Sequence, residues 1–453
     1  MNTWSKEAIF YHIYPLGFCD APKHNDFVSK SVPRIEKVYQ WITHIKYLGA
    51  NSIYFGPIFE STSHGYDTSD YSLVDRRLGD NGTFSKLVNA LHDNGIRVII
   101  DGVFNHVGRD FWAFKDVLVN GQKSRYCNWF SNLDFNQKSP LNDSFNYDTW
   151  NGYYNLVKLN LHTPEVKEYI FQAVTAWIKE FDIDGLRLDC ADCLDLNFLA
   201  ELSCFCKGIK SDFWLLGEVL HGDYNRWANV NRLDSVTNYE CYKGLFSSHN
   251  EKNYFEIAYS LNRQFGEDLG LYKNLYLYNF ADNHDVNRIA STLKKSAHLY
   301  PLSALLFTMP GIPSIYYGSE WGIEGRKNET DDDLRPELNL AMVSSNSPNK
   351  DLAKAISKFA QIRKDSSALR YGKYFQIKVM HEQFAFARMT QDECIIVIVN
   401  SSDKPACMNI GIPVEGVRVV DILNNSETFK IQKRKCYIPK IHPCWVRILK
   451  VEK

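Results

Sequence analysis

At four places in the sequence an ionisable side chain comes directly or shortly after a short apolar run, and the side chains are of types that suit acid–base chemistry. Such runs precede Asp101, Asp189 and Glu218, and a fourth run, Leu-Tyr-Asn-Phe, is followed by Ala-Asp-Asn-His-Asp. An ionisable group seldom ends a buried strand without an ion pair or a chemical task. We therefore predict one shared site. Its candidate residues are Asp101, His106, Arg187, Asp189, Glu218, His284 and Asp285.

Two carboxyl groups of unequal acidity would suit the cleavage of a glycosidic bond. One protonates the leaving oxygen, and the other attacks or stabilises the cationic anomeric carbon. Asp189 lies two residues after Arg187, and alternate residues of a strand point the same way, so we expect the guanidinium to keep Asp189 ionised. Glu218 follows an apolar run, and dry surroundings favour its protonated form. This reasoning predicts Asp189 as the nucleophile and Glu218 as the acid, with Asp285 and the two histidines on sugar hydroxyls.

A metal-dependent hydrolase is an alternative that the histidines and acids raise. Neither His106 nor His284 belongs to an H-E-x-x-H or similar ligand pair, which argues against it. Cys190-Ala-Asp-Cys193 has the spacing of a metal or redox pair, but no second pair or flanking histidine completes a zinc set. We expect a structural role for both cysteines and predict no metal and no cofactor.

The elements that would position these residues are short β-prone runs that alternate with longer amphipathic segments, a pattern typical of parallel strands joined by helices. Strands are predicted at Ala8–Ile13, Ser52–Phe55, Arg97–Val103, Gly185–Leu188, Trp214–Gly217, Ser235–Thr237, Leu275–Phe280 and Ser314–Tyr317, and helices at Ile35–Leu48, Phe84–Asn94, Pro164–Phe181 and Phe198–Ile209. Eight such units predict a (β/α)8 TIM barrel, in which reactive groups gather where strands end. A doubly wound open sheet is the alternative, but no Gly-rich phosphate turn follows the first strand.

Two stretches depart from this alternation. Residues 105–160 form an interval too long for a loop, and we predict an inserted subdomain after strand 3. After about Asp365, short β-prone runs separated by turn residues predict a C-terminal antiparallel β-sandwich. The expected division is therefore a barrel of residues 1–104 and 161–365, a subdomain of residues 105–160 and a β-sandwich of residues 366–453.

Composition argues against several classes of function. The formal net charge of −1 gives no whole-protein attraction to nucleic acid or to an anionic membrane. No apolar run reaches the ~18 residues of a membrane span. Lys6 and Glu7 interrupt the stretch where an export signal would be apolar, and the 11 cysteines show no disulfide framework, so we expect a cytoplasmic location.

Aromatic residues make up 14% of the chain, and their rings offer faces on which sugars stack.

Six ordered motifs resemble the signature regions of the α-amylase family, glycoside hydrolase family thirteen. They are His64–Asp67, Asp101–His106, Gly185–Asp189, Gly217–Val219, Asn283–Asp285 and Gly311–Gly318. The resemblance implies retention of anomeric configuration and no organic cofactor. It implies that Asp189 is the nucleophile, Glu218 the acid/base and Asp285 the stabiliser of the transition state. It also implies a substrate-binding set around the reacting sugar, with Tyr66 stacked under it. The other members of that set are Asp67, Asp101, His106, Arg187, His284 and Arg335.

Within this family, Leu156–Asn160 resembles a motif of the neopullulanase and cyclomaltodextrinase group. This implies hydrolysis of α-1,4-glucosidic bonds in maltodextrins and cyclomaltodextrins, with transglycosylation. Members of the group usually carry an extra N-terminal β-domain used in dimerisation, which we do not expect here because Ala8–Ile13 is already predicted as the first barrel strand. Cys193 stands where relatives place a Glu or His on the leaving-group side.

Several alternatives share the predicted catalytic residues and stay open at this point. An α-1,6-glucosidase, a cyclic-oligosaccharide hydrolase and a glucanotransferase would all use Asp189, Glu218 and Asp285. A non-catalytic α-glucan-binding protein is the remote alternative, because decay of an enzyme should have removed at least one of these three carboxylates, and all are present. The expected partners are α-glucan oligosaccharides, and a homodimer stays open.

Overall fold

Eight parallel strands form the centre of the protein. The computed structural model describes residues 4–268, 270–328 and 330–452. The strands are β1 (Phe10–Ile13), β2 (Ser52–Phe55), β5 (Arg97–Gly102), β9 (Gly185–Leu188), β10 (Trp214–Gly217), β11 (Ser235–Val236), β12 (Tyr278–Asn279) and β13 (Ile312–Tyr316). Their order is β11-β10-β9-β5-β2-β1-β13-β12, and a parallel bridge between Thr237 and Tyr278 joins the two ends. The predicted TIM barrel is confirmed, and the doubly wound sheet is not observed.

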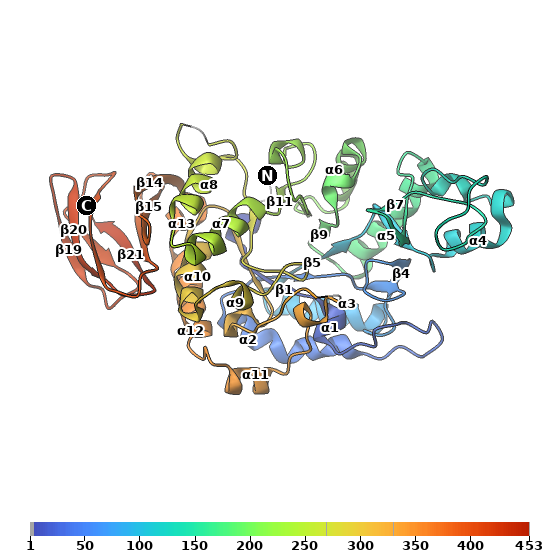
Figure 1. Cartoon of the computed structure of the whole chain (residues 1–453), viewed down its shortest axis with the longest axis horizontal. Coiled ribbons are helices and arrows are strands. Elements are labelled where there is room, and N and C mark those ends of the chain that lie inside the picture. The colour runs from blue at the N-terminus through green and yellow to red at the C-terminus, as the bar shows by residue number, and fades with distance from the viewer. Residues whose placement is uncertain (1–3, 269, 329, 453) are drawn as a thin grey trace.

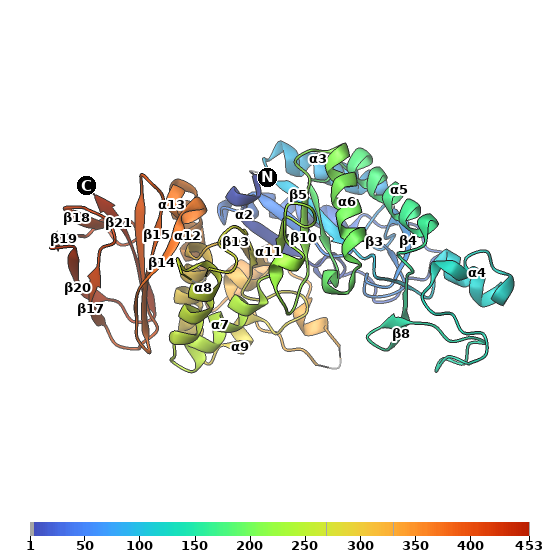
Figure 2. The same cartoon turned by 90° about the horizontal axis from the view of Figure 1, so that it is seen from above.

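Helices surround the barrel and bury its strands from outside, as Figure 2 shows. They include α3 (Asn81–Asp93), α5 (Pro164–Glu180), α6 (Leu196–Ile209), α7 (Tyr239–Asn250), α8 (Phe255–Phe265), α10 (Leu299–Thr308) and α12 (Leu352–Asp365). All residues of β1, β2, β9 and β10 are buried, which is the pattern of a parallel sheet covered by helices. In the described part of the chain, no helix has the length and apolar character needed to cross a membrane.

Two sequence-based predictions of helices differ from the structure in detail. The helix predicted at Ile35–Leu48 is a 3-10 helix at Arg34–Trp41 followed by α2 (Ile42–Tyr47). Pro33 precedes it and offers no side-chain acceptor for the first amides, so no capping bond favours an α-helical start. Helix α5 begins at Pro164 as predicted but ends at Glu180, one residue before the predicted end.

The segment after β5 forms a small antiparallel sheet at one end of the molecule, far from the C-terminal domain (Figure 1). Its strands are β6 (His106–Gly108), β7 (Thr149–Trp150) and β8 (Tyr153–Lys158), in the order β6-β8-β7, and helix α4 (Trp112–Asn120) lies between β6 and β7 in the chain. The register of β6 and β8 pairs His106 with Lys158, so this sheet begins shortly after the end of barrel strand β5. His106 is thereby held at the rim of the barrel.

The C-terminal domain begins with a short helix, α13 (Ser367–Tyr371), that the sequence reasoning did not predict; the Ser366 hydroxyl accepts a hydrogen bond from the amide of Leu369 and so caps it. An eight-stranded antiparallel sheet follows, in the order β14-β15-β16-β21-β18-β19-β20-β17. Its strands are β14 (Lys373–Val379), β15 (Gln383–Met389), β16 (Cys394–Asn400), β17 (Ala406–Gly411), β18 (Arg418–Asp421), β19 (Thr428–Gln432), β20 (Lys435–Ile441) and β21 (Trp445–Glu452).

Strand β15 shows why this sheet has two packed faces. Its residues Phe384 and Phe386 join the core shared with the barrel, whereas Ala385 and Ala387 join a separate core inside the C-terminal domain. Successive side chains of a strand point to opposite faces, so the alternation Phe-Ala-Phe-Ala sends rings toward the barrel helices and methyl groups inward. The prediction of a C-terminal domain of antiparallel strands is confirmed.

A buried ion pair within this domain joins β18 to β21. The Arg447 guanidinium donates to the Asp421 carboxylate at 2.7 Å, and both side chains are almost completely excluded from solvent. Two main-chain amides also donate to Asp421. Removing one member of a buried pair leaves the other charge uncompensated.

We expect the substitution Arg447→Met to lower the free energy of unfolding by about 3 to 5 kcal/mol, because Asp421 would stay buried without its cation. Urea unfolding followed by circular dichroism measures this. The control is Arg418→Met on the neighbouring strand, whose pair with Glu452 is about half exposed and is worth less than about 1 kcal/mol. Equal losses in the two variants would contradict the prediction.

Candidate active site

Alternate residues of each barrel strand face the same side, so a row of polar side chains points into the barrel. Trp214 and Leu216 of β10 belong to an interior cluster, whereas Leu215 packs outward, so Glu218, which follows β10 directly, lies on the interior side. Register places Arg187 of β9 opposite Asp101 of β5. The ring of Phe10 stacks on that of Trp214 with centroids 5.3 Å apart and helps to fill the interior. A packed apolar floor thus supports the polar groups at the strand ends.

The Arg187 guanidinium holds three carboxylates. Its Nη1 lies 2.8 Å from Asp101 Oδ1 and 2.9 Å from Asp189 Oδ1, and its Nη2 lies 2.8 Å from Glu218 Oε2. Burial alone would lower the pKa of Arg187, but the charges of Asp101 and Glu218 hold it well above its usual value. A permanent cation therefore lies between Asp189 and Glu218, and the predicted contact of Arg187 with Asp189 is confirmed.

Glu218 has the acidity that the sequence reasoning expected. Burial raises the pKa of Glu218 to about 8; Arg187 opposes the increase, and the charges of Asp189 and Asp285 add to it. Its Oε2 accepts from Arg187 and, at 3.0 Å, from the amide of Cys190. Because Oε2 already has two donors, the proton belongs on Oε1. That atom is 3.4 Å from the Tyr239 hydroxyl.

Asp285 is held in the opposite state of protonation. Its Oδ2 lies 3.0 Å from His284 Nε2, and its Oδ1 lies 2.9 Å from a guanidinium nitrogen of Arg335. Burial would raise the pKa of Asp285, but His284, Arg335 and Arg187 outweigh it and hold the pKa well below the usual value. Its side chain is 32% exposed, against 10% for Asp189 and 12% for Glu218. Asp285 therefore marks the solvent side of the carboxylate group.

Arg335 is positioned by an acidic residue four positions earlier. Asp331 binds its guanidinium at 2.9 Å, and the guanidinium also donates to the carbonyl of His284 at 3.0 Å and lies over the ring of Tyr14. Asp331 therefore helps to direct this cation toward Asp285.

Asp101 lies deepest and is fully buried. Its Oδ2 accepts hydrogen bonds from the hydroxyls of Tyr54 at 2.8 Å and Tyr66 at 2.9 Å, and burial raises the pKa of Asp101. The Tyr66 ring lies parallel to that of His284, with centroids 5.5 Å apart, and its hydroxyl also bonds to His284 Nε2. The network links the end of β5 to the segment after β12.

His106 and Asp67 complete the set of predicted residues. His106 Nε2 is 3.9 Å from Asp189 Oδ2, and Trp150 of the inserted segment lies against the ring, with centroids 5.7 Å apart. Burial lowers the pKa of His106, while Asp189 and Asp67 oppose the decrease. The structure thus brings together all ten residues predicted for catalysis and substrate binding. These are Tyr66, Asp67, Asp101, His106, Arg187, Asp189, Glu218, His284, Asp285 and Arg335.

Three buried polar atoms of the site have no hydrogen-bond partner among the described residues. They are Asp67 Oδ1, His106 Nε2 and His284 Nδ1. A buried polar atom without a partner costs about 1 to 3 kcal/mol. A ligand rich in hydroxyl groups would satisfy such atoms, so they favour the binding of a polar molecule here.

Sequence reasoning missed Cys190 and Tyr239. Cys190 was expected to have a structural role, but its amide donates to Glu218 and its thiol contacts Asp189 Oδ2 at 2.8 Å. The backbone at Cys190 is left-handed, with φ of 37°, and this turn aims both groups at the two carboxylates. The only feature of the sequence that could have indicated these contacts was the position of Cys190 directly after Asp189. Tyr239 comes from the start of α7, and no local pattern places its hydroxyl beside Glu218.

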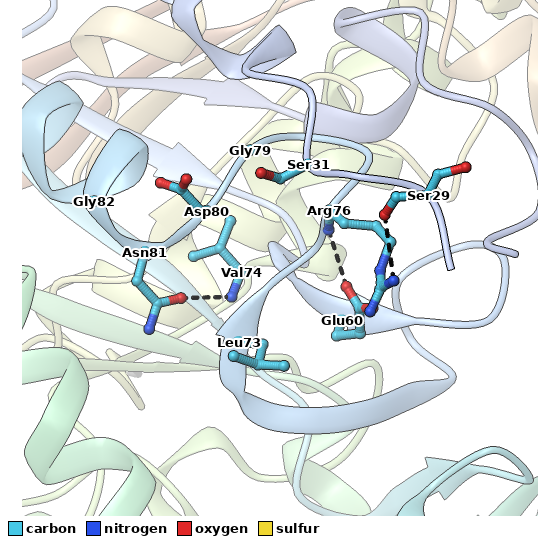
Figure 3. Close-up of a pocket in the computed structure, with 10 residues that line it drawn as sticks. All are labelled: Ser29, Ser31, Glu60, Leu73, Val74, Arg76, Gly79, Asp80, Asn81 and Gly82. Carbon is cyan, nitrogen blue, oxygen red and sulfur yellow. Dashed lines mark hydrogen bonds and ion pairs between the residues drawn. The ribbon is translucent and has the colours of Figure 1, made fainter. Parts of the chain in front are cut away.

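An open pocket of about 450 Å³ shares no lining residue with this site (Figure 3). In it Arg76 points toward Glu60, with Nε 2.5 Å from Oε1, and toward the carbonyl of Ser29. None of its ten lining residues is aromatic. Glu60 is paired with Arg76, and Asp80 accepts hydrogen bonds from Thr83, so both carboxylates of the pocket already have partners.

Comparisons with known proteins agree on one family. A model of the α-amylase catalytic domain matches residues 12–367. The cyclomaltodextrinase of Thermoanaerobacter pseudethanolicus is 32% identical over 96% of this chain and 78% of its own length. A solved cyclomaltodextrinase structure superposes with a TM-score of 0.88 at 28% identity, covering 99% of this chain and 79% of that one. The structure of the cyclic α-maltosyl-(1→6)-maltose hydrolase of Arthrobacter globiformis, in complex with that sugar, superposes with a TM-score of 0.83 at 27% identity. It covers 99% of both chains.

The electrostatic coupling between the carboxylates gives a first test. In the variant Asp189→Asn we expect the pKa of Glu218 to fall from about 8 by about one unit, because a neighbouring negative charge is removed. Infrared difference spectra of the carboxyl stretch against pH measure it. Asp392→Asn, which changes an exposed side chain of the C-terminal domain, is the control and should leave the titration unchanged. A constant or increased pKa in Asp189→Asn would show that the two groups are not coupled.

Proposed function

Because the chain belongs to the α-amylase family of glycoside hydrolases, we propose that it cleaves α-1,4-glucosidic bonds of maltodextrins and cyclomaltodextrins with retention of configuration. The observation that carries the proposal is the pair Asp189 and Glu218, which contact one guanidinium while burial raises the pKa of Glu218 to about 8. A retaining glycosidase needs two neighbouring carboxyl groups, one as nucleophile and one as proton donor.

In the first step, Glu218 gives the proton on Oε1 to the glycosidic oxygen while a carboxylate oxygen of Asp189 attacks the anomeric carbon. The bond from that carbon to the glycosidic oxygen breaks, the shortened sugar leaves with the proton, and a glycosyl ester forms on Asp189. Arg187 contacts Asp189 before the attack and stays bound to Glu218 as its charge develops.

In the second step, the Glu218 carboxylate takes a proton from water, and the water oxygen attacks the anomeric carbon. The ester bond to Asp189 breaks, and both residues return to their first states. A sugar hydroxyl that replaces water gives transglycosylation by the same route. Two inversions at one carbon restore the original configuration.

Asp285 and its neighbours would hold the sugar ring. We propose that Asp285, kept ionised by His284 and Arg335, accepts hydrogen bonds from ring hydroxyls and stabilises positive charge at the anomeric carbon. The unpartnered atoms of His106 and His284 are suited to other hydroxyls of the same ring. Tyr66, whose hydroxyl is fixed by Asp101, would supply the ring that stacks under the sugar.

A reducing, cytoplasmic location fits this activity and is also proposed. All 11 cysteines lie in the described part of the chain and are unpaired. Disulfides are rare in cytosolic proteins and common in exported ones, so a complete set of free thiols favours the cytoplasm. Maltodextrins taken up by a cell would be the corresponding substrates.

Product analysis tests the proposed substrates. We expect α-cyclodextrin, pullulan and maltotriose to be cleaved and isomaltose to be left intact, because the relatives with this site include a cyclomaltodextrinase and the proposal is specific to α-1,4 bonds. Chromatography identifies the products, and proton NMR of the first minutes should show α-anomers. Glu218→Gln is the control that binds sugars without turnover. Cleavage of isomaltose alone would favour the α-1,6-glucosidase, and a first-formed β-anomer would contradict retention.

The pKa of Glu218 predicts how kcat/KM falls at alkaline pH, the alkaline limb of the pH profile. The acid works only when protonated, and its protonated fraction falls as pH rises through about 8, so kcat/KM for maltotriose should fall tenfold per pH unit above that value. α-Maltosyl fluoride is the control, because fluoride leaves without a proton from Glu218 and the limb should flatten. A limb that has the same midpoint and slope for both substrates would show that another group is titrating.

A further inference from the structure

We propose that the nucleophile is part of an inhibitory site for a thiophilic divalent cation such as Zn²⁺, formed by His106, Asp189 and Cys190. His106 Nε2, Asp189 Oδ2 and Cys190 Sγ all lie within 4.8 Å of one another. Imidazole nitrogen, carboxylate oxygen and thiolate sulfur are the donor types that zinc takes in proteins. The inference goes beyond the proposed hydrolysis, because it concerns a ligand that competes with the sugar.

The distances between these atoms are close to those of a zinc site. In a tetrahedral site with zinc bonds of about 2.0 to 2.3 Å, the ligand atoms lie about 3.3 to 3.6 Å apart. His106 Nε2 is now 3.9 Å from Asp189 Oδ2, and Cys190 Sγ is 2.8 Å from the same oxygen. These two distances differ from that range by less than 1 Å, and the third pair, His106 Nε2 and Cys190 Sγ, lies within 4.8 Å.

The histidine is oriented to be a ligand. His106 is 1% exposed, and its Nε2 has no hydrogen-bond partner among the described residues. The other ring nitrogen, Nδ1, faces the Asn105 amide group at 3.2 Å, and the ring also bonds to the Tyr66 backbone. A metal-binding histidine donates its other ring N–H to a second partner, and here the ring donates to the Tyr66 backbone. In the tautomer with its proton on Nδ1, the lone pair of Nε2 faces Asp189 and Cys190.

The charges around Asp189 leave one side of it open to a cation. Arg187 binds Oδ1, whereas His106 and Cys190 approach Oδ2. The guanidinium also contacts Asp101 and Glu218. A cation on Oδ2 is therefore separated from the Arg187 nitrogens by the carboxylate.

Binding would form three bonds between the protein and the metal and would release one proton and bound water. Cys190 loses its S–H proton to solvent as the sulfur–zinc bond forms, and zinc gives up three bound waters. No electron is transferred, because zinc has no redox chemistry here. The Oδ2 lone pair of Asp189 is then bound to the metal, so the carboxylate can no longer attack a sugar. A fourth position stays open for water.

The first experiment titrates Co²⁺ into the full chain as a spectroscopic substitute for zinc, without any sugar. We expect a thiolate-to-cobalt charge-transfer band in the near ultraviolet, lost on addition of Zn²⁺. The variant Cys190→Ser should lack the band, and His106→Gln should weaken binding at least tenfold. Cys193→Ser is the matched control: its thiol is exposed and lies outside the three-residue group, so the band should persist.

The second experiment measures inhibition of maltotriose hydrolysis by ZnCl2 in a buffer that does not bind metals. We expect inhibition that is competitive with substrate, an inhibition constant raised at least tenfold in Cys190→Ser, and less than a twofold change in Cys193→Ser. A cobalt band that depends on Cys193 but not on Cys190, or no band at all, would overturn the metal site. A normal band in a chain that cleaves no α-glucan would instead contradict the proposed function and leave the metal site standing.

Discussion

One buried guanidinium is the interaction on which the site depends. Arg187 contacts Asp101, Asp189 and Glu218 within 3 Å, and its side chain is 4% exposed. Removing one partner of a buried ion pair costs about 3 to 5 kcal/mol, and here a single cation serves three acids. Without it, three carboxyl groups at the strand ends would compete for protons. With it, Asp101, Asp189 and Glu218 all contact one opposite charge, and the proposed mechanism gives Asp189 and Glu218 different tasks.

The barrel produces this arrangement through register. Parallel pairing sets Arg187 beside Asp101, and period-two alternation carries Asp189 and Glu218 to the same interior side. A slip of one residue would turn these side chains out to the helix layer. The stacked Phe10 and Trp214 rings help to fill the space below them, which explains why the polar groups lie at the strand ends and not inside the barrel.

The sequence was sufficient for most of the fold because the barrel strands are short, apolar and regularly spaced. The prediction also brought Asp189 next to Arg187, since that contact needs only the geometry of one strand. It did not find the contact of Tyr239 with Glu218, which joins two different elements, or that of Asp331 with Arg335, which are four residues apart. Cys190 was misjudged for a different reason: its backbone is left-handed, a conformation that residue type alone would not suggest for cysteine.

The central claim is that the structure keeps a proton on Glu218 before a sugar arrives. Neutron diffraction from crystals of the deuterium-exchanged protein at pH 6 measures this directly, because it locates individual deuterons. The account predicts a deuteron on Glu218 Oε1 beside a fully deuterated Arg187 guanidinium. A bare Glu218 would contradict it.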